Sequence, residues 1–201
     1  WVSNTAGMPA PSVKLVLLGD SSVGKTLLAH RFSTDKFDPH TANTIGAAYI
    51  TKDFTSKDRS VKFEIWDTAG QERYRSLTPM YYRNAQVALI CYDLSNLADS
   101  FDKAKFWIDQ LAAQQPLQTF LVGNKSDTKE NDSIMEAEIK SYATEHHLRI
   151  FQTSAKEGLG IGELFAAIVE LLDESTFIVS PKLGASGVDL DNLARAHQGC
   201  C

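Results

Sequence analysis

Short apolar runs alternate with amphipathic stretches along most of this chain, and that alternation limits the possible folds more than any other feature. Six strand-length runs occupy residues 13–18, 47–54, 60–67, 86–93, 119–124 and 149–155. Stretches of helical period occupy residues 25–32, 99–114, 133–147 and 161–174. Strands that alternate with helices predict an α/β fold of three layers, in which helices cover both faces of a mostly parallel sheet. The second and third runs adjoin around residues 56–59, which predicts a hairpin and one antiparallel edge strand.

Length and composition exclude several classes of protein. A chain of 201 residues with 43% hydrophobic content can bury one core, so a single domain is expected. A net charge of -5 argues against a nucleic-acid partner. No apolar run approaches the roughly 20 residues that cross a bilayer, and the first residues lack the pattern of a signal peptide. The three cysteines fit neither a disulfide framework nor a zinc site, and Cys91 lies in an apolar run, which favours a reducing cytosol.

The periodic pattern defines the domain boundaries. It covers residues 12–174, and we expect these to form the folded domain. Residues 1–11 are predicted to be a flexible N-terminal extension, in which Met8 is a candidate native start. Residues 175–201 are rich in small residues and are predicted to be a flexible tail that ends in Cys200 and Cys201.

The segment GDSSVGKT, Gly19 to Thr26, follows the first predicted strand and precedes a predicted helix. It fits the phosphate-loop pattern, in which successive backbone N–H groups surround phosphates. Gly24 lets the main chain approach closely, Lys25 can reach β- and γ-phosphates, and the Thr26 hydroxyl can bind Mg²⁺. A chance glycine-rich turn is the alternative, but the position between strand and helix favours a phosphate site.

The segment WDTAGQE, Trp66 to Glu72, places Asp67 at the end of the third apolar run, where its carboxylate can support a magnesium ion. Gly70 offers an N–H to a γ-phosphate, and the Gln71 amide can orient an attacking water. Alone, this pattern is also an ordinary turn, because Asp and Gly favour turns for local reasons. Its occurrence together with the phosphate loop favours the catalytic interpretation.

Two further segments, GNKSD (residues 123–127) and TSAK (residues 153–156), indicate which base is bound. Guanine presents N–H groups on N1 and N2, which match the two oxygens of Asp127, whereas adenine presents a bare N1 acceptor. Such a site rejects the mispaired base by factors of about 10⁴ or more. The stem of Lys125 can lie along the purine face, and the Ala155 N–H can meet the base O6. All four motifs follow predicted strands, and parallel sheets bind ligands at the carboxyl ends of their strands. We therefore expect one pocket.

With these motifs in order, the chain resembles Rab-family small GTPases over residues 12–173 and at its terminal cysteines. The segments TIGAAY and SLTPMYYR are most similar to the early-endosomal Rab subgroup. The resemblance implies the P-loop NTPase fold, a membrane-anchored GTP/GDP switch in vesicle traffic, and slow GTP hydrolysis. It implies a catalytic role for Lys25, Thr44 and Gln71, and a magnesium site formed by Thr26, Thr44 and Asp67. The nucleotide-binding residues that it implies are Ser21, Ser22, Val23, Gly24, Lys25, Thr26, Leu27, Phe37, Thr44, Gly70, Asn124, Lys125, Asp127, Ser154, Ala155 and Lys156.

The resemblance also implies how such a switch is read and controlled. Tyr49, Trp66 and Tyr81 match an aromatic triad that binds effectors. An exchange factor, a GTPase-activating protein and a dissociation inhibitor or escort protein are implied partners of a monomer. The phosphate loop contains no Arg, so a partner's Arg is expected to raise the rate by roughly 10³ to 10⁵. We expect Arg73 and Arg75 to lie on a solvated helix face.

Cys200 and Cys201 match a prenylated CC ending. Each buried CH₂ contributes about 0.8 kcal/mol and one chain binds a membrane only reversibly, so two prenyl groups are expected. The implied location is the cytoplasmic face of endosomal membranes, with a cytosolic form bound to the dissociation inhibitor. The alternatives are a guanine-nucleotide-binding module with negligible hydrolysis and a P-loop ATPase or nucleotide kinase. Asp127 and the segment TSAK argue against the ATPase and the nucleotide kinase.

Overall fold

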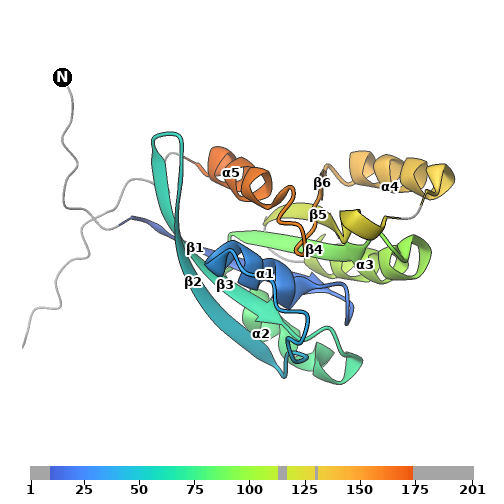
Figure 1. Cartoon of the computed structure of the whole chain (residues 1–201), viewed down its shortest axis with the longest axis horizontal. Coiled ribbons are helices and arrows are strands. Elements are labelled where there is room, and N and C mark those ends of the chain that lie inside the picture. Colours follow the sequence, from blue (N-terminus) through green and yellow to red (C-terminus); the bar gives the residue numbers. More distant parts are fainter. Residues whose placement is uncertain (1–9, 113–116, 130, 174–201) are drawn as a thin grey trace, which may run out of the picture.

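The computed structural model describes residues 10–112, 117–129 and 131–173. Six strands form one sheet in the order β2-β3-β1-β4-β5-β6, with helices on both sides of it (Figure 1). The strands are β1 (Ser12–Gly19), β2 (Ala47–Ser56), β3 (Arg59–Thr68), β4 (Val87–Asp93), β5 (Gln118–Asn124) and β6 (Arg149–Gln152). The helices are α1 (Lys25–Thr34), α2 (Thr78–Tyr82), α3 (Leu97–Ala112), α4 (Ser133–Glu145) and α5 (Ile161–Leu171), with 3-10 turns η1 (Glu72–Leu77) and η2 (Ser126–Thr128).

The pairing of the strands confirms the predicted fold class. Every neighbouring pair is parallel except β2 and β3, which run antiparallel from the pair Ala47 and Thr68 to the pair Ser56 and Arg59. This long hairpin, teal in Figure 1, forms one edge of the sheet, and β6 forms the other. Its position confirms the single antiparallel edge strand that the sequence predicts.

Alternation along the central strands divides the core between the two faces of the sheet. In β1, Leu15 and Leu17 pack in one cluster with residues of α1 and α5. Val16 and Leu18 pack in the other cluster with residues of α3 and α4. All four side chains are fully buried. Covering both faces requires continuous apolar runs in the central strands, and the sequence of β1 and β4 has them.

Several sequence predictions concern residues that the structure does not describe. Residues 1–9 of the predicted extension (residues 1–11), Met8 included, lie outside the described ranges, as does the whole predicted tail (residues 175–201) with Cys200 and Cys201. The predicted helix at residues 99–114 corresponds to α3, whose described part ends at Ala112. None of the helices within the described ranges is both long and apolar enough to cross a bilayer.

Candidate functional site

The four sequence motifs meet at the carboxyl ends of β1, β3, β5 and β6. The side chain of Asn124, at the end of β5, donates to the Val23 carbonyl between β1 and α1 at 2.9 Å. Thr26 at the start of α1 donates to Asp67 near the end of β3 at 2.7 Å. Thr153, after β6, donates to Asn124 Oδ1 at 3.2 Å. The prediction that the motifs lie together is therefore confirmed.

The loop between β1 and α1 depends on a glycine at its end. Gly24 has φ 90° and caps α1 in the left-handed region, which L residues rarely adopt. A Cβ at this position would also lie 2.4 Å from the Asn124 side-chain nitrogen. The sequence predicts that Gly24 admits a ligand, and the structure adds that it admits the Asn124 amide. Val23 is buried in the core, so of this residue only the main chain faces the loop's concave side.

Lys25 is held by the loop that precedes it. Its Nζ lies 2.9 Å from the Gly19 carbonyl oxygen and 2.7 Å from that of Asp20. The side chain is 5% exposed, and burial lowers the pKa of Lys25 below its ordinary value, while nearby acidic groups oppose the change. An ammonium group has three donors. Two are used by the loop, and the third is free to meet an anion in the concave side of the loop.

Three oxygen-bearing side chains from separate segments converge beside the loop. Thr26 Oγ1 and Thr44 Oγ1 lie 2.6 Å apart, and both contact Asp67 Oδ2, at 2.7 and 3.0 Å respectively. Asp67 is fully buried, and its Oδ1 has no hydrogen-bond partner among the described residues. Burial raises the pKa of Asp67, and the two threonine hydroxyls oppose this. Hard oxygen donors with a buried unpartnered carboxylate oxygen could hold a divalent cation such as Mg²⁺.

The segment after β3 lies directly on the loop between β1 and α1 (residues 19–26), which we call the phosphate-type loop. A Cβ at Gly70 would lie 2.3 Å from the Asp20 carbonyl carbon and the Ser21 nitrogen. The Ala69 N–H donates to the Gly46 carbonyl at 2.9 Å, which ties this segment to the one that carries Thr44. Both segments therefore meet each other at the loop. The neighbouring Gln71 is half-buried, and its Oε1 accepts a hydrogen bond from Arg73 Nε at 2.8 Å.

A pocket opens over this convergence, and nine of its twelve lining residues are ones that the sequence predicts. The lining residues are Ser21, Ser22, Gly24, Lys25, Thr26, Leu27, Thr41, Ala42, Asn43, Thr44, Gly70 and Gln71. Residues 41–43 belong to none of the four sequence motifs. Their position immediately before Thr44 is the only signal that could have identified them, because their residue types are ordinary for a polar loop.

Asn124 acts as a link between two loops. Its amide nitrogen bonds the Val23 carbonyl, and its Oδ1 accepts from Thr153 and, at 3.3 Å, from the Ala155 N–H. Asn124 is 2% exposed, so these contacts account for its polar atoms within the protein. The Ala155 N–H therefore faces Asn124 in this structure, and its expected bond to a base O6 stays a prediction.

Asp127 is positioned by the loop that follows β6. Its Oδ1 accepts from Ser154 Oγ at 2.6 Å, and its side chain is 14% exposed. Lys156 Nζ lies 3.9 Å from the other carboxylate oxygen. Phe37 is half-buried in the segment before β2. Contacts of Asp127 and Phe37 with a base remain predictions.

The three predicted effector residues form one aromatic row across β2, β3 and α2. The Tyr49 and Trp66 ring centroids lie 5.2 Å apart, and those of Trp66 and Tyr81 lie 5.7 Å apart. Tyr49 is 52% exposed, and the neighbouring Ile45 and Met80 are 78% and 69% exposed. Trp66 and Tyr81 are half-buried and pack against the core. The row is therefore a partly exposed apolar surface between the two segments that meet at the loop.

The prediction that Arg75 lies on a solvated helix face is wrong. Its guanidinium lies 4.7 Å from the centre of the Phe106 ring on α3, and its Nη2 lies 3.4 Å from Glu72. The exposed face of Phe106 explains this, because a cation stacks favourably on an aromatic ring. Arg73 is exposed as predicted, although its side chain is bonded to Gln71.

Comparisons with known proteins agree with this geometry. The sequence model of the Ras family matches residues 14–174. The chain is 48% identical over 176 residues, 85% of this chain and 83% of the relative, to the GTP-binding protein ypt5 of Schizosaccharomyces pombe. The match spans every motif that forms the site. The chain therefore belongs to the Ras family of small GTPases.

Proposed function

We propose that the chain is a GTP/GDP switch of Rab type that recruits effectors in endosomal vesicle traffic. The observation that carries this proposal is the convergence of Thr44 on Thr26 and Asp67, together with the contact of Gly70 on the loop. The segment that carries Thr44 and the segment that carries Gly70 both close on this point. A ligand bound at that point is contacted by both segments. When the ligand leaves, both segments lose the same partner and loosen together.

Phosphate binding follows from the loop and Lys25. Lys25 Nζ uses two of its three donors on the loop, and the third can bind an anion together with the loop N–H groups. This anion would lie at the start of α1, where the helix dipole also favours negative charge. Thr26, Thr44 and Asp67 are the residues that would hold Mg²⁺, whose positive charge, when bound, offsets that of the phosphate oxygens. The buried Asp67 Oδ1, which has no partner among the described residues, supports this assignment, because a carboxylate oxygen without a partner is costly to bury.

Guanine selection is assigned to Asp127. Ser154 holds one of its oxygens, which fixes the carboxylate plane and leaves further lone pairs for two N–H groups of a base. A base that lacks those groups leaves the carboxylate unpaired in a largely buried position. This requirement argues against the ATPase and nucleotide-kinase alternative.

Hydrolysis is assigned to Gln71, whose amide can orient the attacking water. In this structure Gln71 Oε1 accepts from Arg73. The oxygen has a second lone pair for a water, but the bond to Arg73 restrains how the side chain can turn towards that water. The loop of residues 19–26 contains no Arg, so we propose a slow intrinsic rate and acceleration by an Arg of an activating protein.

The output of the switch is assigned to the row of Tyr49, Trp66 and Tyr81. Tyr49 and Trp66 lie on the strands that follow Thr44 and precede Gly70, so closure of the two segments orders the row. Exposed aromatic rings are typical anchors of protein interfaces. We propose that effectors bind here in the GTP state, and that an exchange factor, an activating protein and a dissociation inhibitor control the cycle at endosomal membranes.

The experiment that tests the proposal is identification of the bound nucleotide. The protein is purified without added nucleotide and denatured, and the released small molecule is separated by chromatography. GDP in nearly equal molar amount is the expected result. Release of an adenine nucleotide would overturn the role of Asp127, and a protein that also refuses added GDP and GTP would overturn the switch.

A further inference from the structure

An acidic residue outside the four motifs lies beside the base-binding segment. Asp93 ends β4 directly opposite Asn124 of β5, and the Leu94 N–H donates to the Asn124 carbonyl at 2.9 Å. Asp93 is 8% exposed. The carboxyl end of β4 therefore joins those of β1 and β5 at the site, although the sequence analysis assigns it no role.

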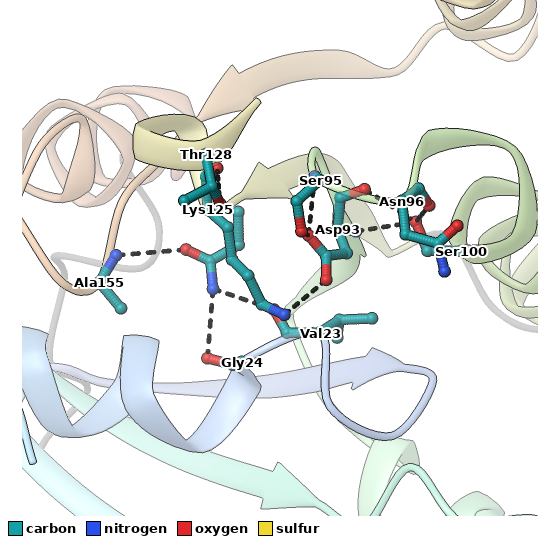
Figure 2. Close-up of polar contacts among 10 residues, drawn as sticks. Val23, Gly24, Asp93, Ser95, Asn96, Ser100, Lys125, Thr128 and Ala155 are labelled. Carbon is teal, nitrogen blue, oxygen red and sulfur yellow. Dashed lines mark hydrogen bonds and ion pairs between the residues drawn. The ribbon is translucent and has the colours of Figure 1, made fainter. Parts of the chain in front are cut away.

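The Asp93 carboxylate is fixed by its own turn and points one oxygen at Lys125. Its Oδ1 accepts from the Ser95 N–H at 2.9 Å and from Ser95 Oγ at 2.7 Å. Its Oδ2 accepts a short hydrogen bond from Lys125 Nζ. The main chain of Asp93 is bonded in both directions to Ser100 Oγ, at 2.9 and 3.0 Å. Figure 2 shows these contacts together.

Lys125 is therefore restrained at both ends. Its backbone has φ 64°, in the left-handed region, and its carbonyl accepts from the Thr128 N–H at 3.0 Å. At the other end the ammonium is bound to Asp93, and Figure 2 shows the stem stretched between these two anchors beside Val23 and Gly24. A lysine stem has several rotatable bonds and loses considerable entropy when a ligand orders it. A stem that is already ordered avoids that loss.

We propose that Asp93 is a positioning residue for guanine nucleotide, which it acts on through Lys125. By holding the ammonium, Asp93 keeps the apolar stem extended as a surface for the purine face. The inference rests on the proposed binding of guanine nucleotide at this site. Removal of the Asp93 charge frees the stem, so bound nucleotide leaves faster.

The test is a double-mutant cycle on the dissociation rate of a fluorescent GDP analogue from the full chain. Asp93→Asn retains an acceptor for Ser95 and removes only the charge that faces Lys125. Lys125→Met removes the ammonium and retains an apolar stem. Each change is expected to raise the dissociation rate on the order of tenfold, which corresponds to about 1.4 kcal/mol. The double variant is expected to dissociate no faster than the faster single variant, because both changes break one contact.

Ser100→Ala is the matched control, because it disrupts the same turn without touching the Lys125 ammonium. It is expected to lower the unfolding temperature and to leave the dissociation rate within about twofold of the parent. If dissociation tracks the unfolding temperature across all variants, Asp93 only supports the turn and the proposal is overturned. The proposal is also overturned if Asp93→Asn leaves the dissociation rate unchanged. It is overturned as well if the increase in the double variant equals the product of the two single increases, because the residues would then act independently.

Ser95 offers a second variant that tests the orientation of the Asp93 carboxylate. Should Asp93→Asn fail to fold, Ser95→Ala removes one donor that orients the carboxylate and is expected to raise the dissociation rate about threefold; an unchanged rate would then contradict the proposal. If the parent chain binds no guanine nucleotide, the proposed function fails. If it binds normally and Asp93→Asn has no effect, only the role of Asp93 fails.

Discussion

Replacement of Gly70 by Ala tests whether the segment after β3 must lie directly on the phosphate-type loop. The added Cβ would lie 2.3 Å from backbone atoms of Asp20 and Ser21, whereas ordinary contact begins near 3.4 Å. Backbone on the loop side is held by the bonds of Lys25 to Gly19 and Asp20. The segment that carries Gly70 must therefore retreat by about 1 Å, the difference between these distances.

That retreat displaces Gln71 from its place beside the loop. A misplacement of about 1 Å can cost on the order of 10²-fold in rate, so Gly70→Ala is expected to slow hydrolysis about a hundredfold. GDP affinity should change by less than about threefold, because the predicted partner of the Gly70 N–H is the γ-phosphate, which GDP lacks. Single-turnover hydrolysis of loaded GTP and dissociation of a fluorescent GDP analogue measure the two quantities separately.

Gly162→Ala is the matched control. This glycine lies in α5, with nothing within 4 Å of an added Cβ. The change is expected to leave hydrolysis unaltered and to stabilise the protein by about 0.4–1 kcal/mol, because alanine at a helical position reduces the conformational freedom of the unfolded chain. Hydrolysis by Gly70→Ala at the parent rate would refute the reasoning from the contact.

Cys91, Ser154 and Arg73 each give an expected outcome that can be measured. Burial raises the pKa of the Cys91 thiol from 9.0 to about 12, so Cys91 is expected to resist thiol reagents in the folded Cys200→Ser, Cys201→Ser variant at pH 8. Because the folded state keeps this proton longer than the unfolded state does, stability should fall as pH rises from about 9 towards 12; urea titrations across that range would detect it. Ser154→Ala removes a bond to the Asp127 carboxylate and is expected to speed GDP dissociation about tenfold in stopped-flow measurements, since such bonds contribute about 1.5–3 kcal/mol. Arg73→Ala removes the solvent-exposed bond that restrains the Gln71 amide and is expected to raise intrinsic hydrolysis about fivefold, because exposure to solvent reduces the contribution of this charged donor to about 1 kcal/mol; a slower rate would instead assign Arg73 a supporting role.

The sheet and the position of the site were predictable from local patterns. The continuous apolar runs of β1, β4 and β5 require cover on both faces, and the adjoining runs of β2 and β3 require a hairpin. Parallel strands bring their carboxyl ends to one edge. Motifs that follow such strands, such as those at Asp67 and Asn124, therefore had to meet. These inferences needed only residue order and spacing.

Contacts between segments far apart in the chain were not predictable in the same way. Nothing in the spacing of Arg75 and Phe106 indicates that the η1 turn lies against α3, because η1 has no helical period of its own. The role of Asn124 as a link between two loops depends on side-chain direction. Asp93 carried a usable signal, since an acidic residue at the end of a fully apolar strand is unusual. Its pairing with Lys125 depends on the left-handed backbone of that lysine.

In the proposed switch, residues 41–46 and 69–77 close together on the terminal phosphate of GTP. Hydrogen exchange, followed by mass spectrometry on the chain loaded with GDP and then with a non-hydrolysable GTP analogue, measures this closure. Both segments should gain protection together in the GTP-analogue form, while the β4 and β5 amides stay unchanged. Equal protection of both segments in the two forms would contradict the switch.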